Sequence, residues 1–160
     1  MFVWILVGIP GAGKSTWAKE KAKDGNTIII SRDDLRYMIK GEYIFDMRYE
    51  PLIKEMSRSM IADAMRAGFD IIIDETNITK RQRTEIIEFV KDNEDFDDFA
   101  SIIAVVFEEK ENNLENRMRE PRGLSRDLWE SVINKMKDNW EDITDDERFV
   151  KIINIEGRII

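Results

Sequence analysis

The sequence has 160 residues, no cysteine and no histidine, and its 33 acidic side chains outnumber its 25 lysines and arginines, giving a formal net charge of −8. The length fits one domain with its own core, and the missing residue types exclude disulfides, thiolate metal sites and cysteine nucleophiles, so any general base must be a carboxylate, a lysine or a tyrosine. The acidic balance argues against a broad basic surface for long duplexes, but not against a local basic cleft.

The first predicted element is the apolar run at residues 2–7, which has the length of a β-strand. It lacks a basic leader and a small-residue cleavage site, so it does not indicate a signal peptide. No run approaches the roughly 20 apolar residues that a membrane span needs. We therefore expect a cytoplasmic protein with no membrane partner.

Strand-like and helical segments alternate along the rest of the chain. The later strand-like runs are 27–30, 69–73, 102–107 and 149–155. Helical segments are indicated at 14–23 and 49–67, after a capping box of Thr79 and Gln82, and from Ser125 onward. This alternation predicts an α/β fold, with a mainly parallel sheet of about five strands covered by helices on both faces. No repeat or linker divides the sequence, so we expect residues 1–160 to form a single domain whose ligands bind at the carboxyl ends of the strands.

Residues 8–15 read Gly-Ile-Pro-Gly-Ala-Gly-Lys-Ser and match the pattern G-x-x-x-x-G-K-[S/T]. Glycines let successive backbone N–H groups point inward around phosphate oxygens, and the N-terminus of the following helix favours the same anion. Lys14 supplies charge to the terminal phosphates, and the Ser15 hydroxyl is placed for Mg²⁺. The alternative is a glycine-rich turn with a chance Lys-Ser. The position between a strand and an amphipathic helix favours a site for ATP and Mg²⁺.

Two carboxylates, Asp33 and Asp34, follow the second strand-like run and are expected at the same sheet edge as the glycine loop. In phosphoryl transfer to a hydroxyl, a positioned carboxylate accepts the proton. If a helix begins here, Arg36 lies one turn after Asp33 and places an anion-binding guanidinium beside a base. The alternative is that Ser31 or Asp33 only caps this helix.

The third strand-like run leads into Asp74-Glu75-Thr76-Asn77 at the same edge. Asp74 or Glu75 can hold the magnesium shell through water, as the acid of a Walker B strand does. Thr76 and Asn77 can hydrogen-bond a substrate. The alternative is that Asp74 and Thr76 only shape the turn into the next helix.

Arg117, Arg119 and Arg122 cluster between two helical segments, beside Pro121 and Gly123. Arginines on a mobile segment can close over a nucleotide and stabilise the charge of a phosphoryl group in transfer. For Arg119, a solvated helix face is an equally good interpretation. The segment therefore predicts a lid, without deciding which arginine contacts the phosphates.

Together these segments resemble the phage polynucleotide 5'-hydroxyl kinase family and its small P-loop kinase relatives. The matching pieces are GIPGAGKSTWA at 8–18, SRDDLR at 31–36, DETN at 74–77 and NRMREPRG at 116–123, in family order. The resemblance implies a P-loop kinase-type domain with a small arginine-bearing lid at about 114–126. It also implies transfer of the ATP γ-phosphate to the 5'-hydroxyl end of DNA or RNA in nucleic-acid repair, in the host cytoplasm if the chain is phage-encoded.

The resemblance assigns roles to individual residues. It implies that Asp33 is the general base, with Lys14 and Arg122 completing the catalytic set. Arg36 is expected on the first internal phosphate of the acceptor, with Thr76 and Asn77 nearby. The expected ATP-binding residues are Gly8, Gly11, Ala12, Gly13, Lys14, Ser15, Thr16, Arg117, Arg119 and Arg122.

The sequence departs from the family pattern in two ways. The family's lid usually ends in an Arg-Gly four residues after an earlier arginine, whereas Arg117 and Arg122 are five residues apart with Arg119 between them. The better-known members also carry a phosphatase domain, whereas we expect the kinase module alone here. Two alternatives stay open: a P-loop kinase for another acceptor, such as tRNA-linked serine, a sugar nucleotide or a small metabolite, and a nucleotide-binding module without acceptor chemistry.

Overall fold

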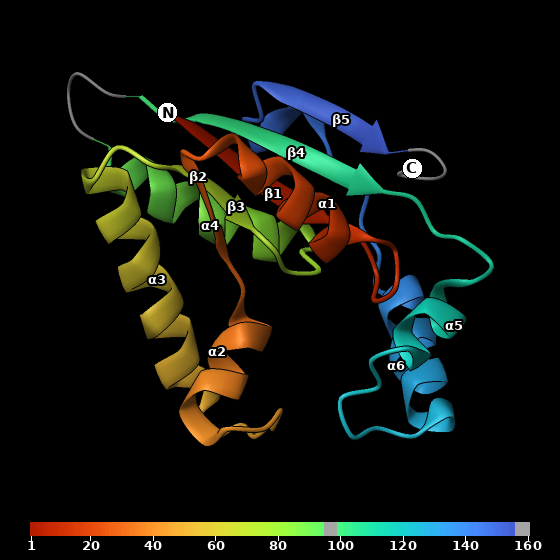
Figure 1. The fold of residues 1–160 in the computed structure, drawn as a ribbon. Coiled ribbons are helices and arrows are strands. Elements are labelled where there is room, and N and C mark those ends of the chain that lie inside the picture. The colour runs from red at the N-terminus through yellow and green to blue at the C-terminus, as the bar shows by residue number, and fades with distance from the viewer. Residues whose placement is uncertain (95–98, 156–160) are drawn as a thin grey trace.

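The computed structural model describes residues 1–94 and 99–155, and these residues form a five-stranded sheet flanked by helices (Figure 1). Every strand pair is parallel, and the strand order is β2-β3-β1-β4-β5. The strands are β1 (Phe2–Val7), β2 (Thr27–Ile30), β3 (Asp70–Ile73), β4 (Ser101–Phe107) and β5 (Lys151–Ile155). The predicted α/β fold with five parallel strands is confirmed, and residues 95–98 and 156–160 of the predicted domain lie outside the described part.

The central strands form because their sequences are largely apolar and rich in β-branched residues. In β1, Val3 pairs with Ile71 on one side and with Ile102 on the other, and all three side chains are 0% exposed. Val and Ile suit a pleated surface, and a parallel sheet that is covered on both faces needs apolar residues at every position. Because β1 is the central strand of the sheet, its carboxyl end lies in the middle of the sheet edge.

Six α-helices and two short 3₁₀ helices connect the strands in the described part of the chain. They are α1 (Lys14–Lys21), η1 (Ala22–Asp24), α2 (Arg32–Lys40), α3 (Glu50–Arg66), α4 (Lys80–Asp92), α5 (Asn113–Met118), α6 (Arg126–Asp138) and η2 (Asp145–Glu147). The predicted Thr79–Gln82 capping box is present at α4, and Ser125 caps α6. None of the described helices is both long and apolar enough to cross a membrane.

Alternate residues of β1 divide the core between the two faces of the sheet. Val3 and Ile5 pack with side chains of α3 and α4, whereas Trp4 and Leu6 pack with Ala18 of α1. Beyond the carboxyl edge of the sheet, α2 lies on one side of the glycine loop and the α5–α6 pair on the other (Figure 1). The two sequence segments with candidate site residues thus flank the loop.

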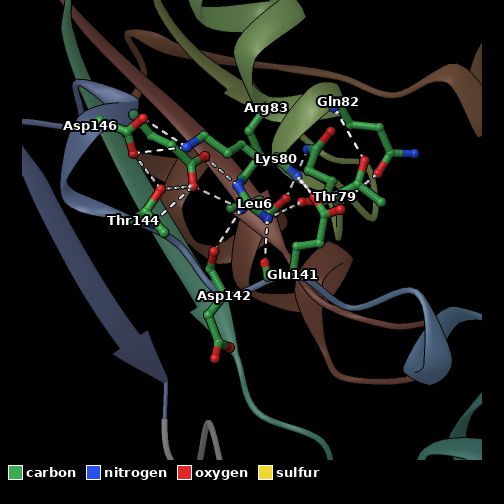
Figure 2. A network of polar contacts seen from close by, with 11 residues as sticks. Leu6, Thr79, Lys80, Gln82, Arg83, Glu141, Asp142, Thr144 and Asp146 are labelled. Atoms are coloured by element: carbon green, nitrogen blue, oxygen red, sulfur yellow. Dashed lines mark hydrogen bonds and ion pairs between the residues drawn. The ribbon is translucent and has the colours of Figure 1, made fainter.

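A buried arginine joins α4 to the segment before β5 (Figure 2). Arg83 is 0% exposed, and its Nε and one terminal nitrogen donate to the two carboxylate oxygens of Glu147 at 2.6 and 2.9 Å. The same guanidinium donates to the backbone carbonyls of Asn77, Glu141 and Asp142 at 3.2, 2.9 and 3.2 Å. Because the charge is paired and its N–H groups have partners, this network stabilises the scaffold under the site.

Candidate active site

The glycine loop between β1 and α1 needs glycine at two positions for steric reasons. A Cβ on Gly8 would lie 3.0 Å from the Cβ of Phe107. A Cβ on Gly11, whose φ is +80°, would lie 2.0 Å from the carbonyl oxygen of Asn113 in α5. Close contact with the Cβ of Phe107 favours glycine at position 8, and close contact with the backbone of Asn113 requires glycine at position 11 and brings the loop next to α5. The Gly8 N–H also donates to the Thr76 carbonyl at 2.9 Å, which ties the loop to the end of β3.

Lys14 at the start of α1 is folded back onto this loop. Its Nζ donates to the carbonyl oxygens of Gly8 and Ile9 at 2.7 and 2.9 Å, and the residue is 8% exposed. Burial lowers the pKa of Lys14 to about 8, although the carboxylates of Asp74 and Asp33 oppose the shift. A phosphate group next to Lys14 would stabilise its charged form and raise this pKa again.

The structure brings Asp33 and Arg36 together on one face of α2. Ser31 caps this helix by accepting from the Asp34 N–H at 3.4 Å, so Asp33 is not the cap and its carboxylate is available for other contacts. Arg36 donates to Asp33 Oδ1 at 2.6 Å and to both carboxylate oxygens of Glu50 at 2.8 and 2.7 Å. The fork of two bonds to Glu50 fixes the guanidinium plane beside the Asp33 carboxylate.

Asp33 is also the meeting point of α2 and the predicted lid. Arg122, which is 89 positions later in the chain, forms an ion pair with Asp33 Oδ2, and the Tyr43 hydroxyl donates to Oδ1 at 3.3 Å. Burial acts to raise the pKa of Asp33, but the guanidinium groups of Arg122 and Arg36 outweigh it and hold this pKa below its ordinary value. The carboxylate is therefore ionised at neutral pH and still 37% exposed.

The three arginines of the lid segment differ in their surroundings. Arg117 has a buried Nε and a buried terminal nitrogen without a hydrogen-bond partner, and its guanidinium lies 4.3 Å from the Trp129 ring centre. Burial, reinforced by the charge of Arg122, lowers the pKa of Arg117. Arg119 follows the end of α5 and is exposed. Buried donors without a partner are rare in proteins, and among the three arginines only Arg117 has them. Arg122 is paired with Asp33, and contact of any of the three with a nucleotide stays a prediction.

Of the two acids after β3, Asp74 lies beside the glycine loop. Burial raises the pKa of Asp74, although a hydrogen bond from Ser15 and the charge of Lys14 oppose the rise. Glu75 instead forms an ion pair with Arg32. The Ser15 hydroxyl and the Asp74 carboxylate are hard oxygen donors, and Mg²⁺ typically combines one or two such protein ligands with substrate phosphates and water. This donor pair fits a magnesium ion.

Asn77 has a structural contact that the sequence did not reveal. It is 1% exposed with φ at +45°, and its Nδ2 donates to the Leu6 carbonyl at 2.8 Å, which joins the ends of β3 and β1. Its Oδ1 is buried without a hydrogen-bond partner. Thr76 is half-buried, and contact of Thr76 and Asn77 with an acceptor stays a prediction. Sequence reasoning also missed Tyr43 and Glu50, because no spacing links them to Asp33 and Arg36.

Comparison with known proteins gives both a family and similar structures. A family model described as "AAA domain" matches residues 3–143. The chain is 28% identical over 93 residues to the L-seryl-tRNA(Sec) kinase of Methanococcus maripaludis, which covers 55% of this chain and 35% of that protein. The chain therefore spans about a third of the length of this curated relative.

Two solved structures share the fold. A chain of the Pnkp1/Rnl/Hen1 RNA repair complex is 25% identical with a TM-score of 0.70, and the match covers 86% of this chain and 44% of that one. A fungal RNA kinase has a TM-score of 0.68 at 15% identity, covering 97% of this chain and 38% of that one. The second likeness is one of fold alone.

Proposed function

The chain belongs to this AAA domain family, and from that premise we propose that it is an ATP-dependent kinase that phosphorylates the 5'-hydroxyl end of a polynucleotide, DNA or RNA, in nucleic-acid repair. The observation that carries the proposal is the position of Asp33. This ionised carboxylate lies between Arg36 and Arg122, at the sheet edge that holds the glycine loop. This arrangement suits a 5'-hydroxyl acceptor. Its hydroxyl must approach the γ-phosphate of ATP, and its nucleotide is linked to the first internal phosphate of the strand.

The donor half of the proposed site is built around the glycine loop. The backbone N–H groups of Gly11 and Gly13 and the N-terminus of α1 would hold the β- and γ-phosphates of ATP. Lys14 would exchange its hydrogen bonds with the Gly8 and Ile9 carbonyls for contacts with the phosphates. The negative phosphates would stabilise the charged form of Lys14, which burial disfavours. Arg117 and Arg122 would approach the same phosphates from the lid.

The acceptor half would place the 5'-hydroxyl at Asp33 and the first internal phosphate at Arg36. Asp33 accepts the hydroxyl proton as the oxygen attacks the γ-phosphorus, and the bond from this phosphorus to the β,γ-bridging oxygen breaks to release ADP. Arg122 forms an ion pair with Asp33 in the structure. For this step Arg122 must release Asp33 and contact the γ-phosphate instead. Ser15 and Asp74 would hold Mg²⁺, which neutralises phosphate charge when bound.

The similar proteins support a nucleic-acid acceptor. The RNA repair complex and the fungal RNA kinase favour an RNA end. The L-seryl-tRNA(Sec) kinase favours a second candidate, the hydroxyl of a serine linked to tRNA. Both candidates need a base beside the γ-phosphate, and they differ in the hydroxyl that is presented to it.

The proposal is tested by offering γ-labelled ATP and Mg²⁺ with a panel of acceptors. The panel contains 5'-hydroxyl RNA and DNA oligonucleotides of one sequence, the same oligonucleotides with a 5'-phosphate, seryl-tRNA and free nucleosides. We expect label on the 5'-hydroxyl strands and none on the 5'-phosphorylated ones. A Lys14→Ala preparation must lose this label, which excludes a contaminating kinase. Label confined to seryl-tRNA or to small acceptors, or release of inorganic phosphate alone, would overturn the proposal.

A further inference from the structure

A pocket of about 210 Å³ lies between α3 and α4, beside the carboxyl end of β3. Its apolar wall consists of Ile61, Ile73, Ile86 and Phe89. Pockets that enclose a whole small molecule usually measure about 300–1,000 Å³. This pocket therefore suits one part of a longer ligand better than a complete cofactor.

The polar lining of this pocket carries an excess of positive charge. Four basic residues, Arg32, Lys54, Arg58 and Arg81, face two acidic residues, Glu75 and Glu85. The acids are already engaged: Glu75 by Arg32, and Glu85 by Lys54 at 2.7 Å and by Arg81 at 3.8 Å. Four cations against two carboxylates leave an excess of two positive charges, because Lys54 and Arg81 share Glu85 and Arg58 makes no ion pair.

Among residues 1–94 and 99–155, Arg58 forms no hydrogen bond and no ion pair within 4 Å, although its charge, after the larger effects of Lys54 and Arg81, helps to lower the pKa of Glu85. Its guanidinium carbon lies 5.3 Å from the centre of the Phe89 ring, so its position against the pocket wall is supported by a cation–π contact. Asn77 also lines the pocket, but its unpartnered Oδ1 is itself buried. The pocket thus offers the guanidinium of Arg58 for an anion.

The pocket adjoins the proposed acceptor site through two neighbouring pairs of residues. Arg32 and Glu75 line it, and each is adjacent in sequence to a residue of the site, Asp33 and Asp74 respectively. The ion pair between Arg32 and Glu75 joins the start of α2 to the end of β3, the two segments that also carry Asp33 and Asp74. A strand whose 5' end lies at Asp33 can reach the pocket with a nearby nucleotide.

We propose that this α3–α4 pocket binds an internal nucleotide of the acceptor strand, beyond the first internal phosphate. Arg58, assisted by the exposed Arg81, contacts the phosphodiester, and the isoleucine wall contacts the sugar or base. Guanidinium groups suit phosphate because they present several N–H donors in one plane. The inference rests on the proposed function and adds an explanation for how an acidic protein gains affinity for a polyanion.

The test measures kcat/KM for a series of 5'-hydroxyl acceptors, from a nucleoside 3'-monophosphate to oligonucleotides of increasing length. We expect wild-type kcat/KM to rise when the strand becomes long enough to reach the pocket. Arg58→Glu should remove this rise and lower kcat/KM for the long acceptors about tenfold or more, because charge-assisted hydrogen bonds are lost. The kcat/KM for the nucleoside 3'-monophosphate should not change. Arg58→Gln should give the same pattern to a smaller degree.

The matched control is Arg66→Glu, which makes the same change of charge in the last turn of the same helix, outside the pocket. Fluorescence anisotropy with labelled 5'-phosphorylated oligonucleotides measures binding without chemistry. Arg58→Glu should weaken the binding of the long strands only. If Arg58→Glu binds and phosphorylates long strands as wild type does, or lowers kcat/KM equally for all lengths, the pocket is not a strand site. If no oligonucleotide of any length is phosphorylated, the proposed function fails and the pocket assignment falls with it.

Discussion

Two arginine–carboxylate clusters in this chain look alike in composition but differ in how completely their groups are paired. Around Arg83, one guanidinium meets one carboxylate and three carbonyls, and both Arg83 and Glu147 have side chains that are 0% exposed (Figure 2). Around Asp33, one carboxylate meets two guanidinium groups and remains 37% exposed, with buried, unpartnered nitrogens nearby on Arg117. The first cluster has all its partners within the protein, whereas the second has three guanidinium groups, of Arg36, Arg117 and Arg122, for the two carboxylates of Asp33 and Glu50.

This difference separates scaffold from site. A buried ion pair with every donor used is held in place by the cost of breaking it. A cluster with an excess of buried cations is stabilised when anions bind, and the phosphates of ATP and of an acceptor would supply those anions. Changes in the Arg83 network should therefore affect folding, and changes around Asp33 should affect chemistry.

The largest expected effect is on catalysis, from Asp33→Asn. This change keeps the side-chain shape and removes the proton acceptor, so we expect kcat to fall by about 10²–10⁴-fold, the usual contribution of general base catalysis. The unfolding temperature should remain within a few degrees of wild type. Single-turnover transfer and thermal unfolding measure the two effects. Wild-type turnover would remove Asp33 from the mechanism.

The next effect is on stability, from Arg83→Met. Leaving the Glu147 carboxylate buried and unpaired should cost about 3–5 kcal/mol, which lowers the melting temperature by roughly 6–20 °C for a chain of this size. The double variant Arg83→Met with Glu147→Leu also removes the unpaired carboxylate, so it should recover part of the lost stability. A single variant that melts like wild type, or a double variant that melts lower than the single one, would contradict the scaffold role.

A smaller effect should distinguish two lid arginines. Arg117→Met keeps most of the side-chain volume against Trp129 and removes the unpaired charge, so the KM for ATP should rise about tenfold or more while the melting temperature stays level or rises. Arg119→Met serves as the matched control, because Arg119 is exposed, and should change neither quantity. Equal effects of the two substitutions on KM would mean that burial does not identify the phosphate-binding arginine.

The smallest expected effect is a pH dependence of ATP binding. The pKa of Lys14 is lowered to about 8, so this side chain loses its charge as the pH rises through 8. ATP requires the charged form, so its Kd should be nearly constant below this pH and rise by up to about tenfold per pH unit above it. Asp33 does not contribute in this range, because its pKa lies below its ordinary value. Calorimetric titration at pH 7, 8 and 9 measures the dependence; a flat Kd would contradict it.

The sequence was sufficient for the fold because local signals and global arrangement agree. All five predicted strands are present within two residues of their predicted bounds, since each is a short segment rich in β-branched residues. The Thr79–Gln82 capping box is also local, and it forms as predicted. The glycine loop also has a local signal, the pattern G-x-x-x-x-G-K-[S/T], whereas the contacts that favour glycine at Gly8 and Gly11 are with the distant residues Phe107 and Asn113.

The pairing of groups within the site could not be predicted, because it depends on contacts between distant segments. The ion pair of Asp33 with Arg122 joins residues 89 positions apart, and no local pattern indicates it. The spacing of the lid arginines was ambiguous because the short helix α5 was not predicted. This helix places Arg117 one turn after the buried Asn113 and ends at Met118, which leaves Arg119 exposed.

The central claim is that the phosphate is transferred to a 5'-hydroxyl at the site organised by Asp33. The most direct measurement maps the labelled atom after a single turnover with γ-labelled ATP and a 5'-hydroxyl oligonucleotide. Digestion to mononucleotides should then release all of the label as the 5'-monophosphate of the first nucleoside. Label on any other position, or label present only as inorganic phosphate, would contradict the account.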